Sequence, residues 1–399
     1  MGSRVIETVL IDLDDTLLKN DMEKFIPAYL RLLGDYLSDL APPERIIQEH
    51  LAGTRAMLEN NDPTLTLQAV FAARFYPSLG LIERDLADRL DIFYRELFAT
   101  LKPLTKPVRG ARRLVEWAIE NGLEVVIATN PVFPLTAIEQ RLDWAGLNVG
   151  EVPLALVTSC EMSHFCKPNL AYYAEILGRL GRSPAQAAMI GNDPQADLNP
   201  ASDLGMAVFH VASATSDEYR AGSLGQALLW LKGGPEREDP ADGPRPGVVL
   251  SRMRANLAAL NELVRDLSPT RWRTRPEPAA WSPVEILCHM RDVELEVNGP
   301  RYHALLSQSS AFVPAADPDR WAAERGYIGQ DGESARLDFC RARLENIQLL
   351  ESTGSDVWIR PALHALFGPT DLAELASFVA DHDLLHLDQL RRALAVRPP

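Results

Sequence analysis

The stretch VLIDLDDTL, residues 9–17, decides the fold of the N-terminal half. It is an apolar run, predicted to be a buried strand, that ends in the carboxylates Asp12, Asp14 and Asp15. Ligands of open α/β sheets bind at the carboxyl ends of strands. Because like charges so close together repel, we expect a cation there, and Mg²⁺ suits carboxylate oxygens and a substrate phosphate. An exposed acidic turn, capped by Asp15 or Thr16, is the alternative.

Strand and helix patterns alternate from this stretch to about residue 231. Further apolar runs predict strands at Val5–Leu13, Leu123–Thr129, Pro153–Thr158, Ala187–Gly191 and Met206–Val211, with helices such as Ala111–Asn121 and Asn169–Leu180 between them. Alternation of this kind is typical of a parallel sheet covered by helices on both faces. Between about residues 21 and 101 the pattern is amphipathic and helical only, with helices expected at Lys24–Leu40, Pro43–Leu58, Thr66–Phe75 and Glu83–Phe98. This predicts a helical insert after the first strand.

Residues 232–247, KGGPEREDPADGPRPG, are rich in Pro, Gly and charge and are predicted to be a linker. We therefore expect two domains, residues 1–231 and residues 248–399. After the linker the pattern is all helical, with helices of about 20 residues expected at Val248–Leu267, Pro283–Ser307, Ser334–Ser352 and Asp371–Ala395. Four such helices predict an all-α four-helix bundle.

The composition excludes several classes of protein. The chain has 399 residues, 46% of them hydrophobic, and a net charge of −15. Its acidic character argues against nucleic acid as a partner. No apolar run is long enough to cross a membrane, no signal peptide is seen, and four cysteines do not make a disulfide framework. A cytoplasmic protein without a membrane partner is expected.

The N-terminal half resembles the haloacid dehalogenase superfamily in four motifs that occur in order. These are Asp-x-Asp-x-Thr at Asp12–Thr16, an apolar strand ending in Thr129, Cys166-Lys167-Pro168, and Gly191-Asn192-Asp193 followed by Asp197. The resemblance implies a Rossmann-like α/β core, and it implies that residues 21–101 form a mobile cap over the site. Arg74, Phe75 and Tyr76 are candidate substrate contacts in this cap, but core packing or surface exposure explains each of them better.

The resemblance also implies a mechanism. Asp12 attacks phosphorus and forms an aspartyl-phosphate, while Asp14 protonates the leaving alcohol and later activates water. Lys167 offsets the negative charge of Asp12 and the phosphoryl group. Thr129 and the backbone of Asn130 hold phosphate oxygens.

A Mg²⁺ site follows from the same resemblance. It implies that Asp12, the backbone carbonyl of Asp14, and Asp193 bind Mg²⁺. Asp197 is either a metal-side carboxylate or one that orients Lys167. The acid at position 14 favours phosphate chemistry, because a halide leaving group needs no proton. A small phosphorylated metabolite is the expected substrate.

The second half of the chain contains three histidines that are candidate metal ligands. His382 and His386 are four residues apart and so lie on one face of a helix, which suits two ligands of one metal. An ordinary pair of helical histidines is the alternative. A third histidine, His289, lies on the helix that Ser282 and Pro283 are predicted to open.

The segments around these histidines resemble the DinB family of four-helix bundles. The matching residues are Trp281-Ser282-Pro283, His289-Met290 with Asp292, and the run HDLLHLDQL at 382–390. The resemblance implies that His289, His382 and His386 bind a divalent metal, Zn²⁺ or Ni²⁺. Cys288 is predicted to be a buried hydrophobe, and His303 and His364 to be surface or packing residues.

Three hypotheses follow for the whole chain. The first is a magnesium-dependent phosphatase fused to a metal-binding bundle of unknown role. The second gives the main function to the bundle, as a metal-dependent thiol transferase or isomerase. The third treats the bundle as a dimerisation or sensing module, in which case the chain would form a homodimer.

Overall fold

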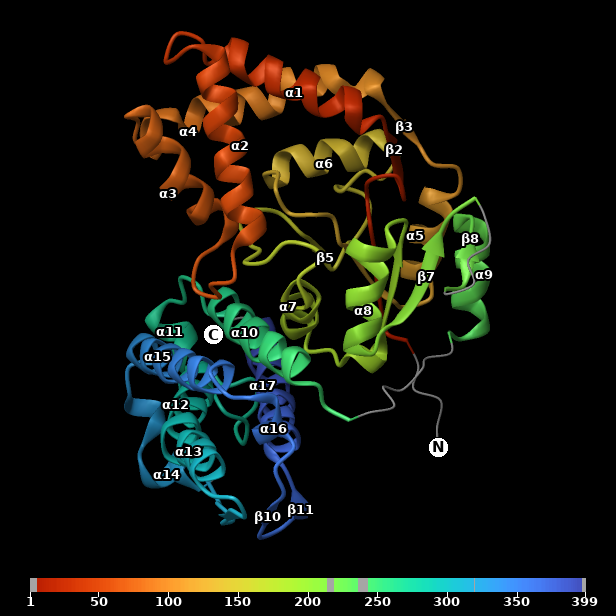
Figure 1. Ribbon diagram of the computed structural model, residues 1–399. Helices are drawn as coiled ribbons and strands as arrows, with labels where there is room; N and C mark the ends of the chain where they lie inside the picture. Colours follow the sequence, from red (N-terminus) through yellow and green to blue (C-terminus); the bar gives the residue numbers. More distant parts are fainter. Residues whose placement is uncertain (1–5, 214–218, 236–242, 319, 397–399) are drawn as a thin grey trace. The chain divides into compact units, whose positions relative to one another are not determined.

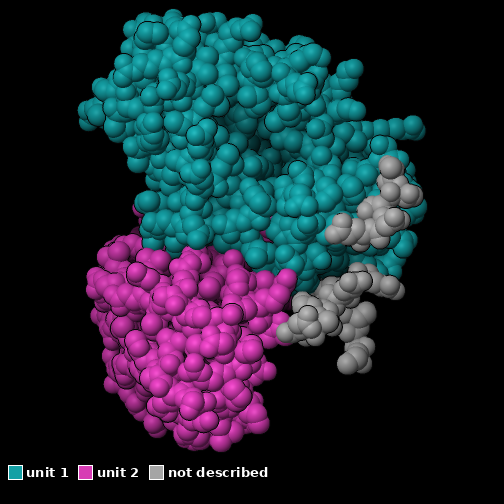
Figure 2. Space-filling model, in the orientation of Figure 1, with its two compact units in different colours: residues 1–172, 184–239 teal, residues 173–183, 240–399 magenta. Residues whose placement is uncertain are grey.

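The computed structural model describes residues 6–213, 219–235, 243–318 and 320–396 (Figure 1). Its contacts divide the chain into two compact units, residues 1–172 with 184–239, and residues 173–183 with 240–399 (Figure 2). Helix α9 (Leu224–Gly233) and helix α10 (Pro246–Leu263) extend into the two ends of the predicted linker. Its residues 236–242 lie outside the described part of the chain.

A parallel sheet forms the centre of the first unit. Its strand order is β5-β4-β1-β6-β7-β8, with the bounds β1 Thr8–Ile11, β4 Glu124–Ile127, β5 Leu156–Val157, β6 Ala187–Gly191, β7 Ala207–Val211 and β8 Ala221–Gly222. Ile11 pairs with Ile127 on one side and with Ile190 on the other. Strands buried on both faces need continuous apolar sequence, which explains why β1 and β6 could be predicted. Since β1, β4 and β6 are parallel neighbours, the residues that follow them meet at one edge of the sheet.

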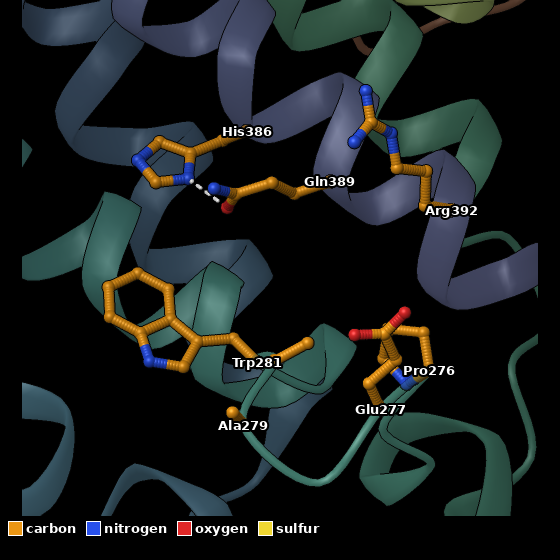
Figure 3. Close-up of a pocket in the computed structure, with 8 residues that line it drawn as sticks. Pro276, Glu277, Ala279, Trp281, His386, Gln389 and Arg392 are labelled. Atoms are coloured by element: carbon orange, nitrogen blue, oxygen red, sulfur yellow. Dashed lines mark hydrogen bonds between the residues drawn. The ribbon is translucent and has the colours of Figure 1, made fainter.

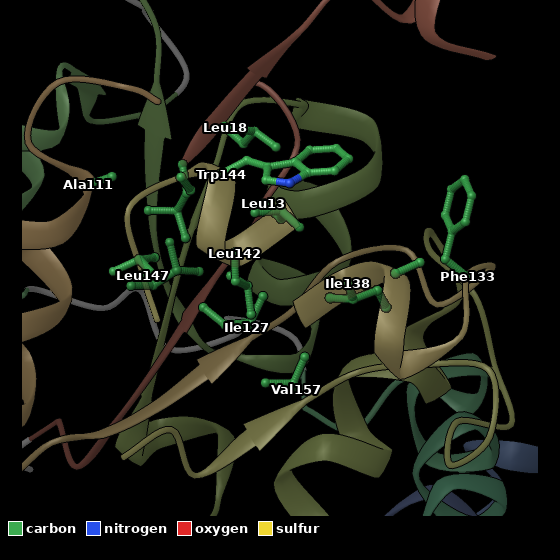
Figure 4. Packing of buried hydrophobic residues seen from close by; sticks show 14 of the residues in the cluster. Leu13, Leu18, Ala111, Ile127, Phe133, Ile138, Leu142, Trp144, Leu147 and Val157 are labelled. Atoms are coloured by element: carbon green, nitrogen blue, oxygen red, sulfur yellow. The ribbon is translucent and has the colours of Figure 1, made fainter. Parts of the chain in front are cut away.

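Helices and short turns connect these strands: α5 Ala111–Glu120, α6 Leu135–Trp144, α7 Leu170–Leu180, α8 Asn199–Leu204, η3 Pro184–Gln186 and η4 Pro194–Leu198. Most of α7, from Tyr173 onward, clusters with the second unit. Figure 4 shows Ile138 and Leu142 of α6 among the buried residues around Ile127 and Val157. Helix α6, which was not predicted, follows two closely spaced prolines, Pro131 and Pro134.

The predicted helical insert is present. It consists of α1 Met22–Tyr36, α2 Pro43–Glu59, α3 Leu67–Leu79, α4 Glu83–Ile92, η1 Phe93–Leu97 and η2 Phe98–Leu104. Figure 1 shows α1 to α4 grouped together in red and orange. The chain enters and leaves the insert through an antiparallel pair of strands that was not predicted, β2 (Leu18–Asn20) and β3 (Thr105–Pro107). The insert and core share one apolar cluster that includes Phe25 and Phe98.

The second unit contains the four predicted long helices: α10, then α12 Pro283–Val293 with its continuation through η5 Glu294–Asn298 into α13 Gly299–Ser307, then α15 Gly332–Glu351, and finally α17 Leu372–Ala395. Helix α12 packs on α15, and α10 packs on α17. Ser282 caps α12 as predicted: its backbone N donates to Oε2 of Glu285 at 2.9 Å, and Pro283 occupies the first turn.

The expectation of helices alone after the linker needs one correction. A small three-stranded sheet, β9 Phe312–Val313, β10 Ala362–His364 and β11 Gly368–Thr370, lies within the second unit, together with the short helical segments α11 Pro269–Arg273, α14 Trp321–Glu324, η6 Tyr327–Gly329 and α16 Ser355–Trp358. Strands of two or three residues are too short to show a periodicity of two. Within the described ranges, no helix combines the length and apolar character that a bilayer span requires.

Candidate active site and metal centre

A buried lysine connects the ends of β1 and β6. Nζ of Lys167 donates to Oδ1 of Asp12 at 2.7 Å and to Oδ1 of Asp197 at 2.6 Å. Asp12, Lys167 and Asp197 are 5%, 6% and 2% exposed. Burial raises the pKa of Asp12 to about 6, with the positive charge of Lys167 acting in the opposite direction. The structure thus brings together the predicted nucleophile and the predicted lysine.

Asp197 has the arrangement of a carboxylate that orients Lys167. Besides the lysine bond, its Oδ2 accepts from the backbone N of Asp193 at 3.1 Å. A Cβ at Gly191 would lie 2.2 Å from that same Oδ2, so the close approach requires a glycine. Of the two roles predicted for Asp197, this geometry favours the orientation of the lysine.

The predicted acid, Asp14, is held by two donors. Its Oδ1 accepts from the side-chain amide of Asn20, at the end of β2, and from the guanidinium of Arg141 on α6. Arg141 is 1% exposed, and its guanidinium carbon lies 5.5 Å from the centroids of the Phe25 and Phe133 rings. Burial lowers the pKa of Arg141 to about 10, although the negative charge of Asp12 acts to raise it.

Sequence reasoning missed Arg141. Its partner lies 127 positions earlier in the chain. A usable signal was present, since Ile138, Arg141, Leu142 and Ala145 follow the spacing of one buried helix face. A charged residue on such a face usually has a buried partner.

The predicted phosphate-binding loop lies beside Lys167. Thr129 is 1% exposed, and its carbonyl oxygen accepts from the hydroxyl of Tyr172 at 2.7 Å and from that of Thr158 at 2.8 Å. The side-chain oxygen of Asn130 accepts from the backbone N of Lys167 at 3.2 Å. Two buried hydroxyls that the sequence did not reveal therefore fix this loop.

Asp193 begins the π-helical turn η4 and caps it. Its Oδ1 accepts from the backbone N of Gln195 at 2.8 Å and of Ala196 at 3.1 Å. Within the described residues, the carboxylates of this site do not lie close enough together to form a cluster of three metal ligands. The donor types nevertheless fit Mg²⁺, because Asp12, Asp193 and the backbone carbonyl of Asp14 all supply hard oxygen ligands near one sheet edge.

The three predicted histidines do come together. Each offers one ring nitrogen, and these atoms all lie within 4.8 Å of one another. Nε2 of His382 and Nε2 of His386 are 3.0 Å apart, and the His289 ring centroid lies 4.8 Å from that of His386. Nδ1 of His386 contacts Oε1 of Gln389 at 2.9 Å, an arrangement that directs Nε2 toward the other rings.

Burial and the two neighbouring imidazoles lower the pKa of His386 to about 3, so this ring is neutral. Neutral imidazole is the form that binds metals, and the donor set therefore fits a divalent cation. A cavity of about 480 Å³ opens beside His386 (Figure 3). Trp281 lines one part of it, with its ring nearly parallel to that of His386, and Arg392 and Glu277 line another.

The predictions for three further residues of the second unit, Cys288, His303 and His364, agree with the structure. Cys288 is fully buried, and burial raises the pKa of its thiol to about 11. His303 is exposed, whereas His364 is buried with its ring stacked on that of Phe367 at 4.4 Å. All four cysteines of the chain are free thiols.

Residues 6–205 match the family model of the haloacid dehalogenase-like hydrolases, and residues 252–390 match that of the DinB superfamily. The first match covers half of the chain. The chain belongs to the haloacid dehalogenase-like hydrolase family. It carries a DinB-like domain at its C-terminal end, so both predicted resemblances are confirmed.

Solved structures that are similar to parts of this chain are distant in sequence. A haloacid dehalogenase-type phosphatase from Thermococcus onnurineus is 19% identical, with 58% of this chain and 100% of that chain covered and a TM-score of 0.39. YfiT from Bacillus subtilis, described as a probable metal-dependent hydrolase with a four-helix bundle, is 13% identical over 40% of this chain and 95% of that chain, with a TM-score of 0.35. The L-2-haloacid dehalogenase from Xanthobacter autotrophicus is 17% identical over 57% and 99%, with a TM-score of 0.35. No curated protein matches this chain significantly.

The cap of this haloacid dehalogenase-like hydrolase borders a cavity of about 230 Å³. The cavity lies between cap residues that include His50, Tyr76 and Tyr94 and the core residues Val132 and Glu161. Burial lowers the pKa of His50 to about 4, so its imidazole is neutral.

The three candidate cap contacts have different surroundings. Tyr76 lines the cavity. Phe75 is buried in the apolar cluster that the cap shares with the core. Arg74 pairs with Glu49 at 2.8 Å and its side chain is 46% exposed.

Proposed function

We propose that the N-terminal domain is a magnesium-dependent phosphomonoester hydrolase that acts through an aspartyl-phosphate on Asp12. The observation that supports this most is the pairing of Asp12 with Lys167 in a buried site at the rim of the sheet. Phosphoryl transfer depends on positioning and on neutralisation of negative charge, and a buried lysine beside a carboxylate serves both.

In the proposed first step, Oδ of Asp12 attacks phosphorus while the bond to the leaving oxygen breaks. Asp14 donates its proton to that oxygen, and Asn20 and Arg141 hold Asp14 in place. Lys167 reduces the charge repulsion between Asp12 and the phosphoryl group. Backbone and hydroxyl groups at Thr129 and Asn130 bind its oxygens.

In the second step, Asp14 takes a proton from water, which attacks phosphorus and frees Asp12 and inorganic phosphate. Asp12, Asp193 and the backbone carbonyl of Asp14 would hold Mg²⁺, which when bound neutralises phosphoryl charge. A carboxylic acid at position 14 favours an ester leaving group over a halide, because only the alkoxide needs a proton.

A small phosphorylated metabolite is the proposed substrate, and the cavity of about 230 Å³ that the cap borders is a candidate place for its leaving group. The net charge of −15 argues against nucleic acid as a partner. A panel of phosphomonoesters, assayed with Mg²⁺ and with excess chelator, tests the proposal. We expect turnover that the chelator abolishes, and the absence of turnover across a broad panel would contradict it.

For the bundle we propose a divalent-metal site on His289, His382 and His386, with Zn²⁺ and Ni²⁺ as candidates. The adjoining cavity of about 480 Å³ supports a second candidate function, a metal-dependent thiol transferase or isomerase. Transfer of a thiol to an electrophilic small molecule, assayed with His382→Ala as the control, tests it. Equal rates with and without the metal would contradict it.

The module hypothesis has support of its own. Leu366, Phe367 and Phe378 are 70%, 60% and 46% exposed, and the two phenylalanine rings lie 5.2 Å apart. Apolar groups gathered on a surface are typical of interfaces. A mass measurement in solution distinguishes the cases: a homodimer that Phe367→Asp converts to a monomer would support the module, and a monomeric wild-type chain would exclude it.

A further inference from the structure

The three histidines come from only two helices. His289 lies on α12, and His382 and His386 lie on α17. Two histidines one helical turn apart have a spacing fixed by their own helix. The distance to the third ligand depends on how α12 and α17 are held relative to each other, and ligand geometry must be right to within about 0.5 Å for tight binding.

A single buried guanidinium connects these two helices. Arg343 of α15 is 1% exposed. Its Nε and one terminal nitrogen each donate to Glu294 at 2.8 Å, and that terminal nitrogen also donates to Oδ1 of Asp383 at 3.0 Å. Its other terminal nitrogen pairs with Oδ2 of Asp383. Both carboxylates are therefore engaged through both of their oxygens.

The two carboxylates lie next to the histidines in the chain. Asp383 directly follows His382 on α17. Glu294 is the first residue of η5, which continues α12 five residues after His289. Arg343 thus connects the turn of helix that follows His289 to the turn of α17 that carries His382.

The carboxylate of Glu294 is also fixed from a second direction. It accepts from the side-chain amides of Asn298 at 2.9 Å and Asn346 at 2.7 Å. Burial opposes the charge on Arg343, but Asp383 and Glu294 hold its pKa well above the ordinary value. A charged network with this many bonds is rigid, whereas a buried ion pair adds little stability compared with apolar residues of similar size.

We propose that Arg343 is a positioning residue for the three-histidine site, which sets the spacing of α12 and α17 so that the ligand nitrogens converge. The inference rests on the proposed metal site. In the structure the nitrogens lie within 4.8 Å of one another, and Nε2 of His382 and Nε2 of His386 are 3.0 Å apart. Tetrahedral Zn–N bonds of about 2.0–2.1 Å require a spacing of about 3.4 Å. Without the guanidinium, two buried carboxylates would repel and the two helices would move apart.

The test measures metal affinity of the full chain by chelator competition, and the visible absorption spectrum of bound Co²⁺. We expect Arg343→Met to weaken Zn²⁺ binding about 10- to 100-fold, as loss of a group that orients ligands usually does, and to alter the Co²⁺ spectrum. Glu294→Gln keeps the size of the side chain and is expected to weaken binding in the same direction. If Arg343→Met does not fold, Glu294→Gln still tests the positioning role.

Arg254→Met is the matched control. Arg254 is another buried arginine of the same unit, 9% exposed, but it joins α10 to Glu351 of α15 and contacts neither histidine-bearing helix through that pair. The Arg254→Met variant is expected to bind Zn²⁺ with the affinity of the wild type. If Arg343→Met and Glu294→Gln both keep the wild-type Zn²⁺ affinity and Co²⁺ spectrum, the positioning role of Arg343 is overturned, whereas the metal site is not. A wild-type chain that binds no Zn²⁺ would overturn the metal site and the inference with it.

Discussion

The Nζ atom of Lys167 lies 2.7 Å from Oδ1 of Asp12, although 155 positions separate the two residues in the chain. Strand β1 ends just before Asp12, and the segment that carries Lys167 reaches the same sheet edge. The cation lies where an attacking carboxylate and a phosphoryl group would otherwise repel each other.

Lys167→Met should lower kcat by about 10²- to 10³-fold, the usual effect of removing one preorganised group that stabilises developing charge. The steady-state rate on the best phosphomonoester measures it. Lys106→Met removes an exposed lysine of β3 and should leave the rate unchanged. A rate within twofold of the wild type in Lys167→Met would exclude the proposed role of the lysine.

Asp12→Asn should stabilise the metal-free protein at neutral pH. The carboxyl group has a pKa raised by burial from 3.8 to about 6, so its ionisation costs stability above pH 6 and nothing well below pH 4. The expected gain is about 1–3 kcal/mol at pH 7.5, and it should shrink between pH 6 and pH 4. Denaturant unfolding at several pH values measures it.

The exposed Asp85 of α4 provides the control, since substitutions at the surface usually change the free energy of unfolding by less than about 0.5 kcal/mol. A gain for Asp12→Asn that stays constant from pH 4 to pH 7.5 would show that desolvation of the charge is not its cause.

Arg141→Met should reduce kcat about 10- to 100-fold. It removes a charge-assisted hydrogen bond that holds Asp14, typically about 1.5–3 kcal/mol, and each 1.4 kcal/mol is tenfold. Methionine suits the position between Phe25 and Phe133, so we expect the fold to persist. Arg112→Met removes an exposed arginine that pairs with Glu116 and should have no effect on kcat. Equal losses in both variants would exclude the positioning of Asp14.

His382→Ala should remove the bundle metal, with about one equivalent per chain in the wild type and little in the variant. His303→Ala removes an exposed histidine of the same unit and should keep the metal. A chelator should also lower the unfolding temperature of the wild type, because metal at 100 times its Kd stabilises the folded state by about 2.7 kcal/mol. Equal metal content in His382→Ala and the wild type would contradict the three-histidine site.

The sequence predicts best what periodicity and motif spacing encode. Strands β1 and β6 and the long helices α2, α15 and α17 are within a few residues of their predicted bounds. Short elements such as β2 and β9 have too few residues to show a pattern. Asp12 and Lys167 could be paired because both lie in ordered motifs, whereas nothing in the sequence near Arg141 or Arg343 identifies a partner far away in the chain.

The most direct test of the central claim is the mass of the chain when turnover of a phosphomonoester with Mg²⁺ is stopped by acid. The account predicts one phosphoryl group on the peptide that contains Asp12, and neither adduct nor turnover in Asp12→Asn. Turnover that persists in Asp12→Asn, or phosphate release without any adduct on that peptide, would contradict it.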